Sequence, residues 1–199
     1  MAQNGWSAFL TDCLLVGAGQ HARVVAEILT LNGDRIVAYS DLKPQTWISA
    51  PHLTEQDWSN QVTSGTFVLG LGGVTPAQLL HRRLLMEKCK SLGLVALSRC
   101  HPTASISQDA NVAQGALVFA GAVVNVGASL GEGVILNSAA IIEHDCAIGA
   151  GSHIAPGAII LGGAKIGSCC MIGAGSVILP NTTVPDNAMV AALTRGLIT

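Results

Sequence analysis

Charged residues are scarce in this sequence. Asp, Glu, Lys and Arg together make up 11% of the 199 residues, and the formal net charge at pH 7 is −2, whereas an ordinary soluble protein is roughly 25% charged. The ten Lys and Arg residues are spread thinly along the chain. Because a nucleic-acid-binding protein gathers basic side chains on one surface, this distribution argues against a nucleic-acid partner.

Long hydrophobic runs are also absent, although the mean hydropathy is +0.51. The most apolar run, residues 116–124, is nine residues long and contains a glycine, and a helix that spans a bilayer needs roughly 20 apolar residues. The first thirteen residues have neither the basic stretch nor the apolar stretch of a signal peptide. We therefore expect a cytoplasmic protein with no membrane partner. The six cysteines form no Cys-x-x-Cys pair, and we expect no disulfides.

A strict period of six residues occupies the second half of the chain. Ile, Leu or Val recurs at every sixth position from Ile106 to Val190, which makes fifteen positions without an exception. A small residue stands two positions before nearly every one of them, with Val134 the one bulkier member, and glycine often stands three positions after. This period fits neither an α-helix nor a simple strand pair, and it predicts a parallel β-helix of hexapeptide repeats.

The hexapeptide pattern also predicts how the coils are built. The aliphatic residue of each hexad points inward, the small residue fits where the chain turns, and glycine supplies backbone freedom at the corner. Three hexads, or 18 residues, close one three-sided coil, so residues 104–190 make nearly five coils. A stacked core of aliphatic side chains accounts for the high mean hydropathy, and such coils bury surface only against their neighbours.

The block before the repeats alternates strand and helix patterns. Short apolar stretches predict strands at residues 13–16, 36–41, 66–73 and 93–97, with helices at about residues 22–31 and from Thr75-Pro76 to about Cys89. Thr75 is predicted as the N-cap and Pro76 as the first helical residue. This pattern predicts a small parallel sheet of Rossmann-like βαβ type. We place the domains at residues 1–99 and 100–199.

The glycine turn "GAGQHA", residues 17–22, lies between the first strand and the first helix. Backbone N–H groups and a helix N-terminus at such a turn can bind a phosphate, although an ordinary tight βα turn is an equal alternative. Asp41, at the end of the second strand, is placed to accept hydrogen bonds from a ribose. A nicotinamide dehydrogenase is disfavoured, because the block amounts to one mononucleotide half and no substrate domain with an acid/base pair follows.

His144 is the strongest candidate for chemistry in the repeats. It stands between Glu143 and Asp145, and a neutral imidazole can accept a proton near neutral pH. Either neighbouring carboxylate could orient the ring and stabilise the imidazolium. The alternative is a solvated histidine on an edge of the β-helix.

His153 follows nine residues after His144, which is one and a half sides of the coil. Two side chains that far apart around a prism should not converge within one chain, so a shared site would lie between subunits of a symmetric oligomer. The alternative for His153 is a surface position on a corner. Asn137 could donate its amide to the site or cap a turn. Cys146 occupies a small, inward-facing position and is expected to be a packing residue rather than a nucleophile, as are Cys169 and Cys170.

These features together resemble a known family. A βαβ domain with a GxGxxx turn precedes hexapeptide repeats that contain "NSAAIIEHDCAIGAGSHIAPGA", residues 137–158. This arrangement is similar to the bacterial nucleotide-sugar acetyltransferases, which include UDP-4-amino-sugar and perosamine N-acetyltransferases and the related sialic acid O-acetyltransferases. The resemblance covers nearly the whole chain. It implies a left-handed β-helix and a homotrimer with active sites between neighbouring β-helices.

The resemblance also implies roles for individual residues. His144 matches the general base, Asp145 matches the carboxylate that strengthens it, and we add Asn137 as a candidate amide donor. Positions that match contacts to acetyl-CoA are His153, Ala174 and Ala192. Positions that match contacts to the nucleotide-sugar are Gly19, Gln20, His21, Asp41 and Gly72. The turn "GAGQHAR" departs from the family's usual G-x-G-G-H-G-K, and Gln20 therefore implies a different nucleotide preference.

We accordingly expect an acetyl-CoA-dependent N-acetyltransferase that modifies the amino group of a nucleotide-linked 4-amino-4,6-dideoxy sugar for glycan biosynthesis. The transfer is expected to be direct, in a ternary complex, with no metal. An O-acetyltransferase acting on sialic acid is the nearest alternative. A hexapeptide carbonic anhydrase would need three histidines around zinc, and the repeats contain only His144 and His153, with His101 just before them. A non-catalytic β-helix that serves as a binding module is the remaining alternative.

Overall fold

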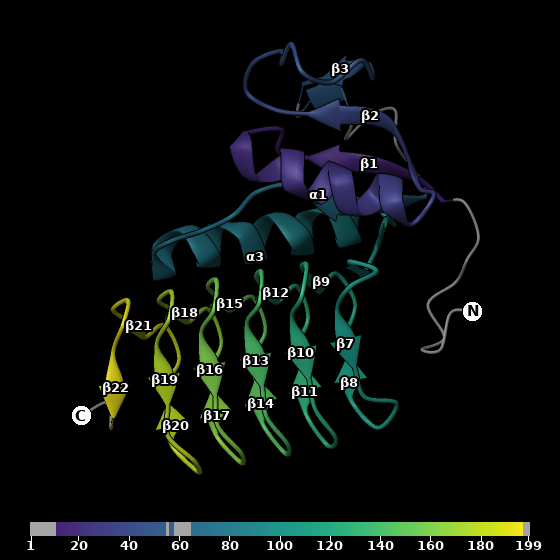
Figure 1. Ribbon diagram of the computed structural model, residues 1–199. Coiled ribbons are helices and arrows are strands. Elements are labelled where there is room, and N and C mark those ends of the chain that lie inside the picture. The colour runs from purple at the N-terminus through teal and green to yellow at the C-terminus, as the bar shows by residue number, and fades with distance from the viewer. Residues whose placement is uncertain (1–10, 55, 58–64, 197–199) are drawn as a thin grey trace.

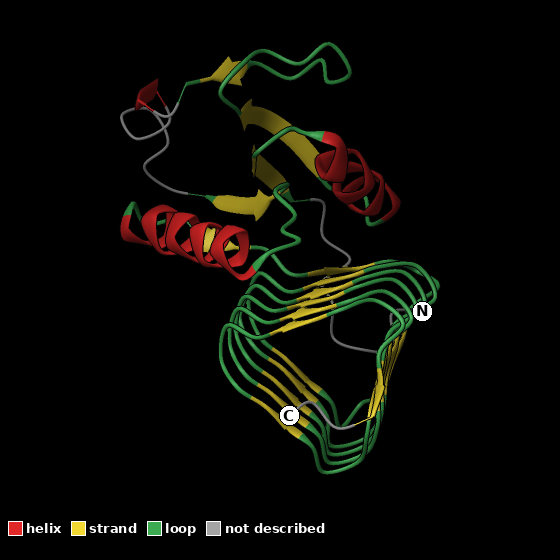
Figure 2. Ribbon diagram, turned by 90° about the vertical axis from the view of Figure 1, so that its left-hand side faces the viewer, coloured by secondary structure: helices red, strands yellow, loops and turns green. Residues whose placement is uncertain are grey.

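The structure is a computed structural model and describes residues 11–54, 56–57 and 65–196. The first ten residues, to which most of the signal-peptide prediction applies, lie outside these ranges. None of the helices within them combines the length and the apolar character that a membrane span requires. An α/β unit stands on one side of a three-sided stack of coils (Figures 1 and 2).

The α/β unit has one parallel sheet with the strand order β3-β2-β1-β4-β5. Helices α1 and α3 cover its opposite faces, because α1 packs on Leu15 and α3 on Leu14, which alternate along one strand. The element bounds are β1 (Asp12–Val16), α1 (Gln20–Leu31), β2 (Arg35–Ser40), β3 (His52–Leu53), β4 (Thr66–Leu69), α3 (Pro76–Ser91) and β5 (Val95–Ala96).

The predicted strands and helices of this unit are present, although β4 ends at Leu69, four residues before the predicted end, and β5 spans only Val95–Ala96 of the predicted residues 93–97. The Thr75 hydroxyl accepts a hydrogen bond from the Gln78 N–H at 3.3 Å, and Pro76 is the first helical residue. α1 begins at Gln20, two residues before the predicted start, with Gly19 as its N-cap. α3 continues to Ser91, and the short edge strand β3 was not predicted.

The second half of the chain forms a parallel β-helix whose strands pair with those 18 residues away, as in Ile142 with Ile160. The face that lies under the α/β unit, named the covered face, contains β6 (Arg99–Cys100), β9 (Leu117–Val118), β12 (Ile135–Leu136), β15 (His153–Ile154), β18 (Met171–Ile172) and β21 (Met189–Val190). β6 lies at the predicted domain boundary, and the division at residues 99/100 stays a prediction.

The other two faces of the prism differ in the residues that point outward. One contains β7 (Ser105–Ile106), β10 (Val123–Val124), β13 (Ile141–Ile142), β16 (Ile159–Ile160), β19 (Val177–Ile178) and β22 (Arg195–Gly196). The other contains β8 (Asn111–Val112), β11 (Ser129–Leu130), β14 (Ala147–Ile148), β17 (Lys165–Ile166) and β20 (Thr183–Val184). The first residue of each strand points outward. We name the former the apolar face, after its row Val123, Ile141, Ile159 and Val177, and the latter the polar face.

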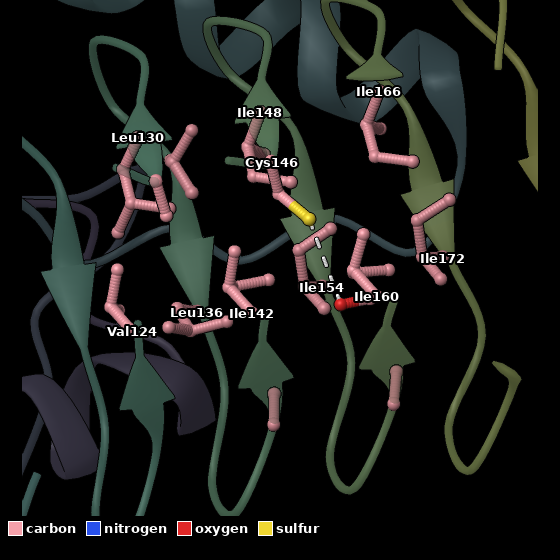
Figure 3. Close-up of a cluster of buried hydrophobic side chains, with 14 of the residues drawn as sticks. Val124, Leu130, Leu136, Ile142, Cys146, Ile148, Ile154, Ile160, Ile166 and Ile172 are labelled. Carbon is pink, nitrogen blue, oxygen red and sulfur yellow. Dashed lines mark hydrogen bonds between the residues drawn. The ribbon is translucent and has the colours of Figure 1, made fainter. Parts of the chain in front are cut away.

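The core of the β-helix is the predicted stack of aliphatic side chains. All fifteen residues of the period-six series belong to it or pack against it, together with most of the residues two positions before them. Figure 3 shows the ladder from Val124 to Ile172 along the inside of the prism. Burying one such side chain contributes roughly 1.5–3 kcal/mol, so the repeats provide a continuous core.

The α/β unit is held on the covered face by apolar packing and by buried polar groups. Leu117, Phe119 and Ile135 of the β-helix share one buried cluster with α1 and β1. The Arg99 guanidinium makes two hydrogen bonds to the Asp34 carboxylate, at 2.5 and 2.7 Å, and the two side chains are only 6% and 0% exposed. These contacts determine which part of the α/β unit faces the coils.

Candidate active site

The glycine turn closes tightly around the ends of β1 and β2. Gly17 has a φ of +83°, and a Cβ at this residue would overlap the side chain of Leu71. The Ala18 N–H donates to Asp41 Oδ2 at 2.7 Å, so this carboxylate already accepts one hydrogen bond from the turn. The Trp47 indole N–H donates to the Ala18 carbonyl at 2.9 Å. The structure therefore places Asp41 beside the glycine turn, where one of its carboxylate oxygens accepts a hydrogen bond from the backbone.

An open cleft of about 540 Å³ lies beside this turn, between the loop after β4 and the first turns of α3. Its lining includes Gly72, Gly73, Gln78 and His81. A Cβ at Gly72 would lie 3.2 Å from Cγ of His21, so the two predicted residues are in close contact. Gly19 is the N-cap of α1, and Gln20 and His21 are its first two residues, where the first N–H groups have no intrahelical partner and can bind an anion.

His153 is buried at 5% exposure on β15, so the alternative of a surface corner position is wrong. Its Nδ1 lies 2.7 Å from the Gly73 carbonyl oxygen, and its Nε2 lies 3.0 Å from Asn137 Nδ2. Asn137 Oδ1 accepts the Ser138 N–H at 2.8 Å, which orients the amide with its NH₂ toward the ring. A carbonyl oxygen can only accept, so Nδ1 carries the proton and Nε2 accepts. His153 is thus a neutral ring with both nitrogen atoms in use.

His21 lies between the α/β unit and the coils, with ring centroids 5.4 Å from Phe119 and 6.5 Å from His153. Its Nε2 is buried without a hydrogen-bond partner among the described residues. Burial lowers the pKa of His21 to about 4, with smaller contributions from His153 and Arg82. Burial also lowers the pKa of His153. Both rings are therefore neutral near pH 7.

The protein should lose stability as the pH falls from about 6.5 to about 4. In the unfolded chain a histidine binds its proton near pH 6.5, whereas folded His21 binds it only near pH 4. Over that interval the unfolded state binds more protons, so the free energy of unfolding decreases as the pH is lowered. Urea unfolding across this range should show a smaller decrease for His21→Phe than for the wild type. Equal pH dependence in the two proteins would contradict the assignment.

Arg82 was not predicted, although it reaches the same loop. Its guanidinium is fully buried, Nε donates to the Leu71 carbonyl at 3.0 Å, and Nη1 donates to the Gly133 carbonyl of the β-helix. Nη2 has no partner within the described ranges, and burial lowers the pKa of Arg82 to about 10. A single cation in the middle of a helix carries no sequence signal that distinguishes it from a solvated residue. Its contacts join the cleft loop to the coils.

His144 and Asp145 lie on a different edge of the molecule, between the apolar and polar faces. His144 Nδ1 is 2.9 Å from Asp145 Oδ2, and the two side chains are 60% and 73% exposed. Asp145 has a φ of +60°, at the corner position that glycine often occupies in other hexads. Asp is one of the few residues that tolerate this left-handed conformation. The turn therefore directs the carboxylate toward the adjacent imidazole.

The structure distinguishes the two carboxylates that flank His144. Glu143 Oε2 accepts a hydrogen bond from Asn125 Nδ2 at 3.1 Å, one coil away. Asp145 is the residue that contacts the imidazole. The Cys146 thiol is buried, burial raises its pKa, and it donates to the Leu161 carbonyl at 3.2 Å. The prediction that Cys146, Cys169 and Cys170 are packing residues is confirmed, since all three are buried free thiols.

Ala174 and Ala192 are exposed and stand one coil apart on the edge between the covered and apolar faces. Asn137 lies on the same edge, one residue before the position that is two coils earlier than Ala174. The structure thus brings together two groups: His21, Asn137, His153 and Gly72 near the covered face, and His144 with Asp145 on the far edge of the apolar face. Within the described ranges, no three His, Cys, Asp or Glu side chains are grouped so that they could hold a metal ion.

Comparison with known proteins identifies relatives of both halves. The family described as the PglD N-terminal domain matches residues 12–75. The acetyltransferase domain of PglB from Neisseria gonorrhoeae, solved in complex with acetyl coenzyme A, is 30% identical, with a TM-score of 0.84 over 94% of this chain and 93% of that one. PerB from Caulobacter crescentus, in complex with CoA and GDP-perosamine, is 24% identical with a TM-score of 0.74, over 93% and 96% of the two chains.

A comparison with curated protein sequences finds no significant match. The likeness to PerB supports the fold, and the likeness to the PglB domain extends over nearly the full length of both chains at higher identity. The predicted fold, a Rossmann-like domain followed by a left-handed parallel β-helix, is confirmed. The chain therefore belongs to the family of hexapeptide-repeat nucleotide-sugar acetyltransferases and is an acetyltransferase enzyme.

Proposed function

We propose that the protein transfers the acetyl group of acetyl-CoA to the amine of a nucleotide-linked 4-amino-4,6-dideoxy sugar, with His144 as general base. The observation that carries this proposal is the exposed His144–Asp145 pair on the rim of the β-helix. Acetyl-CoA is the ligand of the 30% identical PglB domain. The predicted cytoplasmic location stays a prediction.

The geometry of the pair suits proton transfer from an amine. When Nδ1–H donates to Asp145, the neutral ring keeps the lone pair of Nε2 free, and within the described residues Nε2 has no hydrogen-bond partner. The amine nitrogen attacks the thioester carbonyl and forms the new C–N bond, while its proton passes to Nε2. The tetrahedral intermediate then breaks its C–S bond, and the imidazolium returns the proton to the departing thiolate. Asp145 stabilises the imidazolium during this cycle.

The acceptor is proposed to bind at the cleft of the α/β unit. Gly19, Gln20 and His21 would hold the phosphates at the start of α1, and Gly72 would border the sugar. Asp41 retains one carboxylate oxygen for a ribose hydroxyl, apart from a 3.5 Å contact with the Lys43 N–H. Acetyl-CoA would follow the edge that carries Ala174 and Ala192, with Asn137 and His153 beside it. His153 would pack its ring against acetyl-CoA rather than hydrogen-bond to it, since both ring nitrogens already have hydrogen-bond partners.

A homotrimer would bring these two groups together. The covered face is closed by the α/β unit and the polar face is hydrophilic, which leaves the apolar face as the one suited to contact another subunit. Its two edges carry the separate halves of the site: His144 on one side, Ala174 and Ala192 on the other. In a closed ring, each interface joins one edge of a subunit to the opposite edge of its neighbour. Each site would then combine His144 of one chain with the cleft of the next.

Replacing Ile159 with glutamate should dissociate this oligomer and reduce acetyl transfer in parallel. Ile159 is at the middle of the apolar row, and an interface that buries an unpaired carboxylate is strongly disfavoured. Sedimentation velocity would report the change in mass. Thr183→Glu, at the corresponding outward position of the polar face, is the matched control and should leave the mass unchanged. A monomeric Ile159→Glu protein with full activity would refute a shared site.

The substrate is tested by measuring release of the CoA thiol from acetyl-CoA. UDP-, dTDP-, GDP- and CMP-linked sugars would first be ranked by thermal shift, since a ligand that binds the native state raises the melting temperature. A nucleotide-linked 4-amino sugar should then support turnover and free sialic acid should not. Turnover with sialic acid alone would replace the proposal by O-acetylation. Absence of turnover with every amino sugar and with sialic acid would indicate a binding module.

A further inference from the structure

The imidazole of His144 lies against Gly162, the residue one coil further along the same edge. A Cβ built at Gly162 would be 2.5 Å from Nε2 and 2.6 Å from Cε1 of the ring. Carbon and nitrogen atoms in contact normally lie about 3.5–4.0 Å apart. The ring therefore occupies the space that a side chain at position 162 would need.

The backbone at Gly162 does not itself call for glycine. Its φ is outside the left-handed region, in contrast to the next residue, Gly163, whose φ is +71°. The described positions 18 residues apart along this edge are Gln108, Val126, His144, Gly162 and Pro180. A residue with a Cβ is thus accommodated before His144, at Val126, and after Gly162, at Pro180, and glycine stands at the position on which the His144 ring rests.

Gly162 also differs from the other glycines of the β-helix that have an unremarkable φ. At Gly131, Gly149, Gly167 and Gly173 a Cβ would overlap the main chain of the next coil. At Gly162 the three nearest atoms all belong to the His144 ring. A methyl group there would leave the coils in place and displace the imidazole, whose side chain is 60% exposed and has solvent to move into.

The coil on the other side of the pair has a matching feature. Gly127 lies one coil before Asp145, and a Cβ there would be 2.5 Å from Oδ1 of the carboxylate. Gly127 has a φ of +70°, so its backbone also favours glycine. The two side chains thus occupy space left free by glycines of both neighbouring coils.

We propose that Gly162 is a positioning residue for His144, because the absence of a Cβ at this position determines where the imidazole lies relative to Asp145 and the acceptor amine. The proposal rests on the proposed function of His144 as general base. A displacement of about 1 Å at a reacting group lowers the rate by on the order of 10²-fold. Gly162→Ala should therefore lower kcat by about that factor, with little change in KM.

Three variants test this in a double-mutant cycle: Gly162→Ala, His144→Ala and the two combined. The melting temperature of Gly162→Ala should equal that of the wild type or exceed it slightly, since alanine restricts the unfolded chain. In the His144→Ala background the second substitution should not change kcat further. An active His144-dependent enzyme whose Gly162→Ala variant keeps the wild-type kcat would overturn the positioning role and leave the proposed function intact.

A readout that does not depend on activity separates the two proposals. The ¹⁵N shifts of the His144 ring, assigned by their loss in His144→Ala, report which nitrogen carries the proton. In the wild type Nδ1 should carry it, and in Gly162→Ala the two tautomers should mix as the ring leaves Asp145. Unchanged shifts in Gly162→Ala would refute displacement of the ring, whatever the enzyme proves to acetylate.

A second variant keeps the test valid if Gly162→Ala folds poorly. Gly127→Ala should perturb the same ¹⁵N shifts by displacing Asp145. Gly121→Ala is its matched control, because this glycine has a similar φ of +67° and its added Cβ would meet nothing closer than 4.0 Å. Equal shifts and equal kcat in these two alanine variants would refute positioning of the His144–Asp145 pair by the glycine one coil before Asp145.

Discussion

Replacing His144 with alanine should lower kcat for acetyl transfer by roughly 10²–10⁴-fold, the usual contribution of general base catalysis. The variant loses an imidazole that is exposed on the edge of the β-helix and hydrogen-bonded to a carboxylate. The fold should be unaffected, because the side chain is 60% exposed and outside the aliphatic core. Steady-state kinetics with acetyl-CoA and a nucleotide amino sugar, together with a melting curve, would check both parts.

His101→Ala is a suitable control for the loss of a histidine from the β-helix. His101 lies on the first coil, where its Nδ1 is 2.8 Å from the Thr103 hydroxyl. This variant should keep kcat close to the wild-type value. A His144→Ala protein whose kcat stays within roughly threefold of the wild type would remove His144 from the role of base.

Replacing Asp34 with alanine should lower the free energy of unfolding by about 3–5 kcal/mol, because it leaves the Arg99 guanidinium buried without its carboxylate. The pair is almost wholly inaccessible to solvent, so water cannot replace the lost hydrogen bonds. For a chain of this length the melting temperature should decrease by roughly 6–20 °C. Differential scanning calorimetry at a fixed protein concentration would measure it, since oligomerisation makes melting depend on concentration.

The exposed ion pair between Asp12 and Arg35 provides the contrast. Their contact is 2.6 Å long, but the side chains are 47% and 65% exposed. Solvent screens such a pair, so Asp12→Ala should change the melting temperature only slightly. Equal losses in Asp34→Ala and Asp12→Ala would mean that the buried pair does not hold the α/β unit on the coils.

The hexapeptide β-helix was predictable because its information is local and repeated. Ile142 packs in the same way as Ile160, and within the β-helix each coil packs on the coils before and after it. The capped helix α3 was predictable for a similar reason, since Thr75 and Pro76 act on the residues beside them. The glycine turn at residues 17–22 and the triplet Glu143-His144-Asp145 could likewise be located from the amino-acid sequence alone.

Partners of the site residues were less predictable, since they come from other coils or from the α/β unit. Both Glu143 and Asp145 stood beside His144 in the sequence, and Asn125, eighteen residues earlier, engages the first of them. The two glycines beside the pair, Gly127 and Gly162, lie one coil before Asp145 and one coil after His144. Stacking of the coils, rather than sequence proximity, decides these contacts.

By itself, the sequence determined the inward-facing stack of aliphatic side chains, the turns between the faces of the β-helix and the position of His144 on one of its edges. Each of these follows from a period of six residues. Only the tertiary structure decided which face the α/β unit covers and what this does to His153. That ring bonds the Gly73 carbonyl, 80 residues away in the chain. The physical reason is that burial and tautomer depend on the groups that surround a side chain in space, and docking of two separate units supplies them.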